Sequence, residues 1–210
     1  MNSLLRRAKK EDAPSFIDIK NQLPITRTDG TTTTGGFLLG TDLKTYEQYI
    51  ETCFCLVAEV NHQIVGFGII FDDKMLRQSD IWQRRGVAQW SIDLKQYESG
   101  RLCYFEQLAF LEGHKRLVIQ LAYNLVKWAF EKNHSVLFTT TVNKPITNLA
   151  AVPFIHAVAG IKAGNIDEVY PSVGPINSDI YIIKREEFYE KMASSVLASY
   201  LMLHTFTFHD

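Results

Sequence analysis

The chain is short of cysteine and carries no excess of charge of either sign. Its three cysteines, Cys53, Cys55 and Cys103, are too few for a disulfide framework, and Cys53-x-Cys55 lacks the CxxC spacing and second ligand pair of a zinc site. The 22 basic and 23 acidic residues give a formal net charge of -1, and no stretch gathers Lys and Arg as binding to phosphate backbones requires. We therefore expect no disulfide scaffold, no metal site and no nucleic-acid partner.

Targeting and membrane segments are also missing from the pattern. Arg6 and Arg7 directly follow Leu4 and Leu5, so the N-terminus has no apolar stretch that resembles a signal peptide. Residues 192–208 contain no Asp, Glu, Lys or Arg, but their Ser, Thr and His side chains make them too polar for a membrane span. We expect a cytoplasmic protein that does not enter a membrane.

Apolar side chains, in contrast, are plentiful. Hydrophobic residues make up 46% and aromatic residues 12% of the 210 positions, enough to bury roughly 70% of the unfolded surface in one core. No repeat or linker divides the chain. We expect a single domain over 1–210, in which 186–210 form a C-terminal extension that packs on the domain or on the partner subunit of a homodimer.

Two apolar segments separated by two residues give the clearest structural signal. Residues 54–60 and 63–71 are mostly β-branched, aromatic or aliphatic, and Asn61-His62 suits a tight hairpin connection. The remaining patterns predict strands at 4–7, 37–39, 102–111, 136–142 and 178–184, and helices after Asp12, after a cap at Thr41, at 117–132, at 148–159 and from Glu186. Residues 28–36 read as a surface loop and 72–100 as an inserted helix or lid. This order indicates an α/β (α+β) fold with a central mixed sheet and helices on its faces.

Four short strings occur along this framework in a definite order. They are LRRAKKEDA at 5–13, IVGFG at 64–68, FEQLAF at 105–110, and Asn148 followed by Phe154, Gly160 and Gly164. Together with the order of the elements, they resemble the GNAT superfamily of acyl-CoA-dependent N-acyltransferases over nearly the whole chain. The resemblance implies a mostly antiparallel sheet, acetyl-CoA or another acyl-CoA as co-substrate, and an amine acceptor on a small molecule or peptide.

The turn at residues 112–120 corresponds to the pyrophosphate-binding turn of that superfamily. There the anion sits on backbone N–H groups at a helix N-terminus, which offers unpaired donors and a partial positive charge. Leu117 and Ile119 stand where the family has small residues, so their branched side chains could block the anion, or they could anchor the helix in the core while the anion site is weakened, displaced or absent. The cofactor-binding residues that the resemblance implies in this turn are His114, Lys115, Arg116, Leu117, Val118 and Ile119.

A carboxylate within an apolar strand is the best candidate for a general base. Acyl transfer to an amine needs a base for the amine's proton, donors for the developing oxyanion and an acid for the leaving thiolate. A period of two puts Leu102, Tyr104, Leu108 and Phe110 on the face of Glu106, where a lone carboxylate is costly unless it meets a partner or a cleft. The alternative is that Glu106 is paired or hydrogen-bonded for structural reasons alone.

The resemblance implies the remaining parts of a site. Backbone N–H groups of Leu108 to Leu111 correspond to oxyanion donors, with Leu108 and Phe110 as cofactor-binding residues, and the alternative is ordinary sheet pairing. His156 lies four residues before the glycine that ends the late helix, where the family commonly has an acid; the alternative is a solvated or core histidine. Asn148 corresponds to a contact with the pantetheine arm of coenzyme A, or it caps the helix that begins there.

Aromatic residues in or beside two segments suggest where the acceptor binds. If the resemblance holds, residues 31–36 and 72–100 flank the acceptor, and Trp82 and Trp90, with neighbouring Phe37, suggest an apolar acceptor pocket.

Two functions of different classes follow. The first is an N-acyltransferase that moves an acetyl or other acyl group from acyl-CoA to an amine of a small molecule or peptide. The second is a non-catalytic binding or interaction module of the same fold that has lost the coenzyme A site. Glu106 and Asn148 favour the first, and the glycine-poor turn favours the second.

Overall fold

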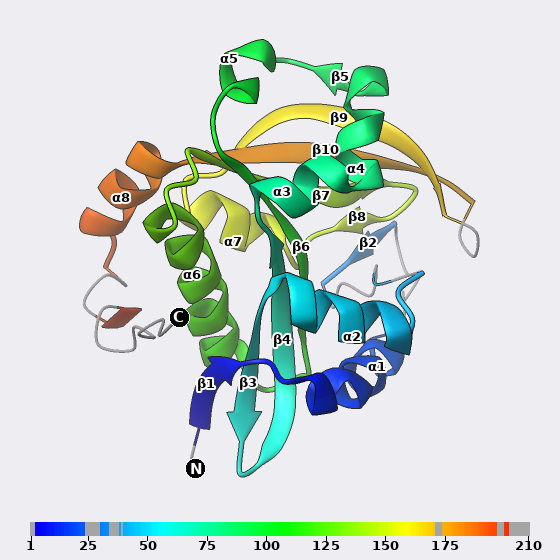
Figure 1. Cartoon of the computed structure of the whole chain (residues 1–210), viewed down its shortest axis with the longest axis vertical. Helices are drawn as coiled ribbons and strands as arrows, with labels where there is room; N and C mark the ends of the chain where they lie inside the picture. The colour runs from blue at the N-terminus through cyan, green and yellow to red at the C-terminus, as the bar shows by residue number, and fades with distance from the viewer. Residues whose placement is uncertain are drawn as a thin grey trace.

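A single eight-stranded sheet organises the chain (Figure 1). The computed structural model describes residues 3–23, 30–33, 38, 40–170, 174–196 and 200–201. The sheet has the order β1-β3-β4-β6-β7-β10-β9-β5, and among these neighbours only β6 and β7 are parallel. Its strands are β1 (Ser3–Arg7), β3 (Phe54–Val60), β4 (Gln63–Phe71), β5 (Gln89–Trp90), β6 (Leu102–Phe110), β7 (Val136–Lys144), β9 (Ile161–Tyr170) and β10 (Gly174–Lys184). The predicted mixed, mostly antiparallel sheet is confirmed.

Helices cover both faces of this sheet (Figure 1). What we call the α2 face is covered by η1 (Lys10–Asp12), α1 (Ala13–Asn21), α2 (Leu43–Thr52), α3 (Asp73–Gln78), α4 (Asp80–Gln83), η2 (Arg84–Val87) and α5 (Lys95–Glu98). What we call the α6 face is covered by α6 (Lys115–Glu131), α7 (Val152–Ala157) and α8 (Arg185–Ala193). The stretch predicted as an inserted helix or lid, residues 72–100, is therefore a run of short helices interrupted by the edge strand β5, which α5 follows.

The hairpin of β3 and β4 forms as the sequence predicts. Asn61 and His62 connect the strands with φ angles of 50° and 68°, the left-handed values that a two-residue type I′ turn needs. The turn twists with the strands and sets the first pairs, with Glu59 opposite Ile64. A bulge then shifts the register by one residue, so that Gly68 lies opposite Leu56.

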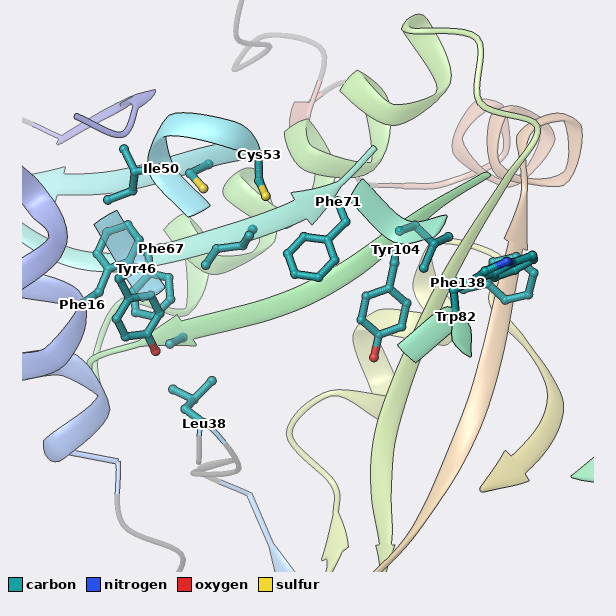
Figure 2. Packing of buried hydrophobic residues seen from close by; sticks show 14 of the residues in the cluster. Phe16, Leu38, Tyr46, Ile50, Cys53, Phe67, Phe71, Trp82, Tyr104 and Phe138 are labelled. Atoms are coloured by element: carbon teal, nitrogen blue, oxygen red, sulfur yellow. The ribbon is translucent and has the colours of Figure 1, made fainter. Parts of the chain in front are cut away.

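Aromatic side chains fill the core on the α2 face. Phe16 of α1 stacks on Phe67 of β4 with ring centroids 3.9 Å apart, and Tyr46 of α2 meets Phe67 edge-on at 5.5 Å (Figure 2). Fully burying such a side chain contributes about 1.5–3 kcal/mol to the free energy of unfolding. On the α6 face, Phe130 of α6 and Phe188 of α8 lie 5.2 Å apart and are buried. The sheet is thus fixed between two independent apolar layers.

Two local predictions about helices are wrong. Asp42, not Thr41, caps α2, because its carboxylate accepts the N–H of Thr45 at 2.8 Å. The helix predicted at 148–159 is confined to α7, because the backbone of residues 147–149 pairs instead with β2 (Thr31–Thr32) as the short strand β8 (Thr147–Asn148). Asn148 consequently caps no helix.

Strand β9 was not predicted from the sequence. Its Gly164, Asn165 and Asp167 are residues typical of turns, yet β10 pairs with it along nearly its whole length. Sheet pairing depends on the neighbouring strand more than on intrinsic propensity. Tertiary contacts therefore decide this element.

Parts of the predicted loop at 28–36, of the strand at 37–39 and of the C-terminal extension lie outside the described residues. Within the extension, the Tyr200 hydroxyl accepts a hydrogen bond from Gln120 at 2.7 Å, and Leu201 is buried in the α6-face core. This much of the extension packs on the domain. In the described part of the chain, no helix has both the length and the apolar content needed to cross a membrane.

Candidate active site

The parallel strands β6 and β7 pair along only part of their length. Their register runs from Leu102 opposite Val136 to Phe105 opposite Thr139, although both strands continue beyond these residues. At the last pair, the Thr139 hydroxyl donates to the Phe105 carbonyl at 3.1 Å. Beyond it the strands part, which leaves an opening in the sheet whose backbone groups need other partners.

A β-bulge lies where the strands begin to part. Ile69 of β4 is opposite Gln107 and Ile70 is opposite Phe105, so Glu106 is an extra residue on β6. Bulges redirect the side chains that follow them.

Because of the bulge, Leu108 and Phe110 lie on the opposite face of the sheet from the one predicted. Leu108 and Phe110 pack against the α6-face core, whereas Ala109 belongs to the α2-face core with Tyr104. The prediction that Leu108 and Phe110 share a face with Glu106 is wrong, because a strict period of two does not hold across a bulge.

Glu106 lies among polar groups on the α2 face. Burial raises the pKa of its carboxyl to about 7; a hydrogen bond from the Gln107 side chain opposes this, and the charge of Glu168 adds to it. Burial, together with the charge of Glu106, also raises the pKa of several hydroxyls, those of Tyr46, Tyr49, Tyr104 and Tyr170. A carboxyl with a pKa near 7 can take up and release a proton at neutral pH.

Gln107 is held in place beside this carboxyl. Its side-chain oxygen accepts from the Tyr46 hydroxyl at 3.0 Å, and its side-chain nitrogen donates to the Thr41 hydroxyl at 3.0 Å. Gln107 and Thr41 are buried. The network fixes the amide that contacts Glu106, and none of its members was predicted as a site residue.

The backbone of β6 presents two N–H groups to the opening. The Leu111 N–H donates to the Val65 carbonyl of β4 at 2.8 Å. Alternate residues of a strand direct their N–H groups to opposite sides, so Ala109 also faces β4 while Leu108 and Phe110 face the opening toward β7. Ordinary pairing with β4 therefore does not occupy these two donors.

The first turn of α6 lies at the end of the same strand. Gly113 has a φ of +88°, α6 begins at Lys115, and its first intrahelical hydrogen bond runs from the Val118 N–H to the His114 carbonyl at 3.1 Å. The N–H groups of the three preceding residues come before that bond, as at any helix N-terminus. Those of Val118 and Ile119 lie within the helix, so within α6 the N–H groups that precede its first intrahelical bond are those of Lys115, Arg116 and Leu117.

Leu117 and Ile119 contact the α6-face core. Both are half-buried and pack against its buried residues, while Lys115 and Arg116 are exposed. The two branched side chains thus have packing partners beneath the helix. Exposed cations in the first turn add positive charge beside the N–H groups.

The comparisons with known proteins concern the fold. No protein-family model and no curated protein sequence matches this chain. An N-acetyltransferase from Staphylococcus aureus matches with a TM-score of 0.61 and 18% identity, over 88% of this chain and 99% of that one. An acetyltransferase of the GNAT family from Streptococcus pneumoniae matches with a TM-score of 0.56 and 17% identity, over 87% and 99%. This chain has the GNAT fold.

A third solved structure shares the GNAT fold. The NatC complex bound to Gag peptide and CoA matches with a TM-score of 0.55 and 13% identity, over 88% of this chain and 99% of that one. At such identities the likeness establishes the arrangement of strands and helices. The resemblance seen in the sequence is confirmed at this level.

His156 and Asn148 lie apart from Glu106 in this GNAT fold. His156, on α7, is exposed; its Nδ1 lies 3.2 Å from the Gly160 carbonyl, and its ring meets Tyr181 edge-on at 5.9 Å. Asn148 accepts the Ala150 N–H at 3.1 Å. Within the described part of the chain, the bonds of both residues go to groups other than Glu106, and α7 lies on the opposite face of the sheet.

A cavity of about 50 Å³ lies on the α2 face of the GNAT fold, between η2 and β5 on one side and β6, β7, β9 and β10 on the other. Trp82 and Trp90 line it, as the pattern of aromatics suggested, and the structure adds Tyr104 and Phe138. Phe37 lies outside the described residues. Glu168, also on the wall, was missed because β9 was not predicted as a strand.

Proposed function

We propose that this protein is an N-acyltransferase, in its simplest form an acetyltransferase, that moves an acyl group from acyl-CoA to an amine of a small molecule or peptide. The observation that carries the proposal is Glu106, an extra residue on β6 beside the β6–β7 opening, with a pKa of about 7. The NatC complex, which is similar in fold, is bound to CoA and to a peptide, and this supports acyl-CoA as the donor and a peptide amine as one kind of acceptor.

Glu106 acts as the general base in this proposal. The amine nitrogen attacks the thioester carbonyl carbon, the new C–N bond forms, and Glu106 takes the proton that the nitrogen loses. A base is most effective when its pKa lies near the working pH, because it is then deprotonated yet still basic. Gln107 orients the carboxylate through the hydrogen bonds that hold its own amide.

Backbone donors stabilise the oxyanion, and an acid completes the transfer. The N–H groups of Leu108 and Phe110 donate to the carbonyl oxygen as it gains charge. When the C–S bond breaks, the thiolate takes a proton, for which we propose His156 as the donor. The products are an N-acyl amine and coenzyme A.

The described residues fit acyl-CoA, which supplies an activated acyl group as a thioester. The N–H groups of Lys115, Arg116 and Leu117, with the two cationic side chains and His114, would hold the pyrophosphate. Asn148 would contact the pantetheine arm. Because Leu117 and Ile119 have packing partners in the core, their bulk does not argue against this fit.

The test is Glu106→Gln, compared with the natural chain. We expect acetyl-CoA and free CoA to bind both proteins in calorimetry, while turnover in Glu106→Gln falls about 10²–10⁴-fold, since the base is lost and the shape is kept. The natural kcat/KM should rise with pH to a plateau above about pH 7. Glu190→Gln, on the exposed side of α8, is the matched control and should change neither quantity.

Two results would overturn the proposal. Absence of acetyl-CoA binding by the natural chain would favour a binding module without a coenzyme A site. Unchanged turnover in Glu106→Gln would remove Glu106 from the chemistry.

A further inference from the structure

The cavity on the α2 face is closed by a segment that is fixed to the sheet. Trp90 of β5 pairs with Gly164 of β9, and the Arg84 guanidinium of η2 lies 2.8 Å from the Glu168 carboxylate of β9. The inserted segment between β4 and β6 thus forms a roof over β6, β7 and β10. The space beneath it is defined by side chains from both sides.

Charged groups around the cavity already have partners. Arg84 is paired with Glu168, and Arg85 is paired with Glu98 at 3.0 Å and lies over the Trp82 ring at 4.5 Å. A charged ligand group placed here would have to break one of these pairs or remain unpaired, and an unpaired buried charge is strongly unfavourable.

The uncharged polar groups of the wall are also satisfied. The Tyr104 hydroxyl and the Thr140 hydroxyl lie 2.7 Å apart and bond to each other. The rest of the wall is largely apolar, with the rings of Trp82, Trp90 and Phe138 prominent in it. Such a cavity suits an uncharged apolar group.

Two residues of the cavity wall interact with the carboxyl of Glu106. Tyr104, which lines the cavity, lies on β6 two residues before Glu106, and the charge of Glu106 helps to raise the pKa of the Tyr104 hydroxyl. Glu168, on the opposite wall, acts electrostatically on Glu106. A molecule whose apolar group fills the cavity therefore lies beside two residues, Tyr104 and Glu168, that interact electrostatically with Glu106.

The volume limits what can enter. A water molecule needs about 10–15 Å³ measured in the same way, so 50 Å³ holds about three to five groups of that size. This corresponds to a short branched aliphatic group. An indole is larger than this space.

We propose that this cavity selects the acceptor: it holds a compact, uncharged aliphatic substituent of about three to five carbon atoms, while the attached primary amine faces Glu106. The inference rests on the proposed function and names its substrate class.

The first experiment compares amines with acetyl-CoA as donor. We expect kcat/KM for 3-methylbutylamine to exceed that for 1,4-diaminobutane, which places a charge at the far end of a similar chain, at least tenfold. Tryptamine should also be a poor acceptor. Equal or better use of 1,4-diaminobutane would overturn the inference.

The second experiment fills the cavity. Ala88 lines it, and in Ala88→Leu we expect the ratio of kcat/KM for 3-methylbutylamine to that for methylamine to fall at least tenfold. Val87→Leu is the matched control: its neighbouring side chain is 73% exposed and the ratio should not change. Ile166→Ala, which enlarges the cavity, should shift preference toward 2-phenylethylamine and serves if Ala88→Leu does not fold. An unchanged ratio in folded Ala88→Leu, or an unchanged preference in Ile166→Ala, would contradict the inference.

An acetyl-CoA titration of the same samples separates the two proposals. Binding and acetyl transfer without the apolar preference would overturn the cavity inference and leave the proposed function standing. No binding and no transfer would overturn both. Binding and transfer with the preference, reduced in Ala88→Leu, would support both.

Discussion

Strand β6 contributes different kinds of side chain to the two faces of the sheet. On the α6 face, Phe105, Leu108 and Phe110 of β6 belong to an apolar layer closed by α6. On the α2 face, Gln107 of β6 bonds the Tyr46 hydroxyl and the Glu106 carboxyl, and Tyr104 of the same strand lines a cavity. One extra residue at the bulge separates the two sets, so a single strand supports both a rigid core and a polar site.

The largest effect should come from the apolar layer. Phe130 is fully buried against Phe188, and Phe130→Ala should lower the free energy of unfolding by about 3–5 kcal/mol through lost burial and a new cavity. Urea unfolding followed by circular dichroism measures it. Val196→Ala, at a side chain 98% exposed, should change stability by less than about 0.5 kcal/mol. Equal effects at both positions would show that the α6 face is not the rigid layer described.

On the polar α2 face, the buried Glu106 carboxyl should make the free energy of unfolding depend on pH. The pKa of Glu106 is raised from 4.5 to about 7, so the folded state keeps a proton that the unfolded state releases, and stability is lost as pH rises through this range. Glu106→Gln removes this loss. Its free energy of unfolding relative to the natural chain should therefore increase from pH 4.5 to pH 8, by an amount on the order of 2–3 kcal/mol. A difference independent of pH would mean that the Glu106 carboxyl is not raised in pKa by burial.

A smaller loss of stability is expected from a change at the contact between β5, in the roof of the cavity, and β9 of the sheet. A Cβ at Gly164 would overlap the Gln89 carbonyl oxygen and lie 3.1 Å from the Trp90 Cα, so Gly164→Ala should separate β5 from β9 and cost about 1–2 kcal/mol. Hydrogen exchange of the Ser91 N–H, which bonds the Ala163 carbonyl at 2.9 Å, should accelerate.

The control is Gly86→Ala, where an added Cβ meets nothing within 4 Å. It should leave both stability and the exchange of Ser91 unchanged. Exchange that is equally slow in Gly164→Ala would show that β5 does not depend on close contact with β9.

Local patterns predicted much of this fold because the relevant signals are local. Apolar runs on either side of Asn61-His62 were enough for the β3–β4 hairpin, and an apolar stripe was enough for α6, which starts at Lys115, two residues before the predicted start. In contrast, β9 is polar and contains Gly164, so it becomes a strand only because β10 lies beside it.

For the candidate site, the sequence singled out Glu106 as a carboxyl in a largely apolar strand, and its burial, which raises its pKa to about 7, agrees with that choice. Residue types alone could not give its surroundings. Gln107 lies on β6, whereas Tyr46 lies on α2 and Thr41 just before it, 61 and 66 residues away in the sequence, and no local spacing relates them. The roles proposed for His156, Asn148 and the first turn of α6 stay predictions for the experiments above.

The sequence by itself determined the alternation of strands and helices, the hairpin turn and the presence of a carboxyl in an apolar strand, since these depend on neighbouring residues. Only the tertiary structure decided the bulge that places Glu106, the opening between β6 and β7, and the cavity beneath the inserted segment. Each of these depends on register and packing between residues far apart in the chain, which local propensity does not encode.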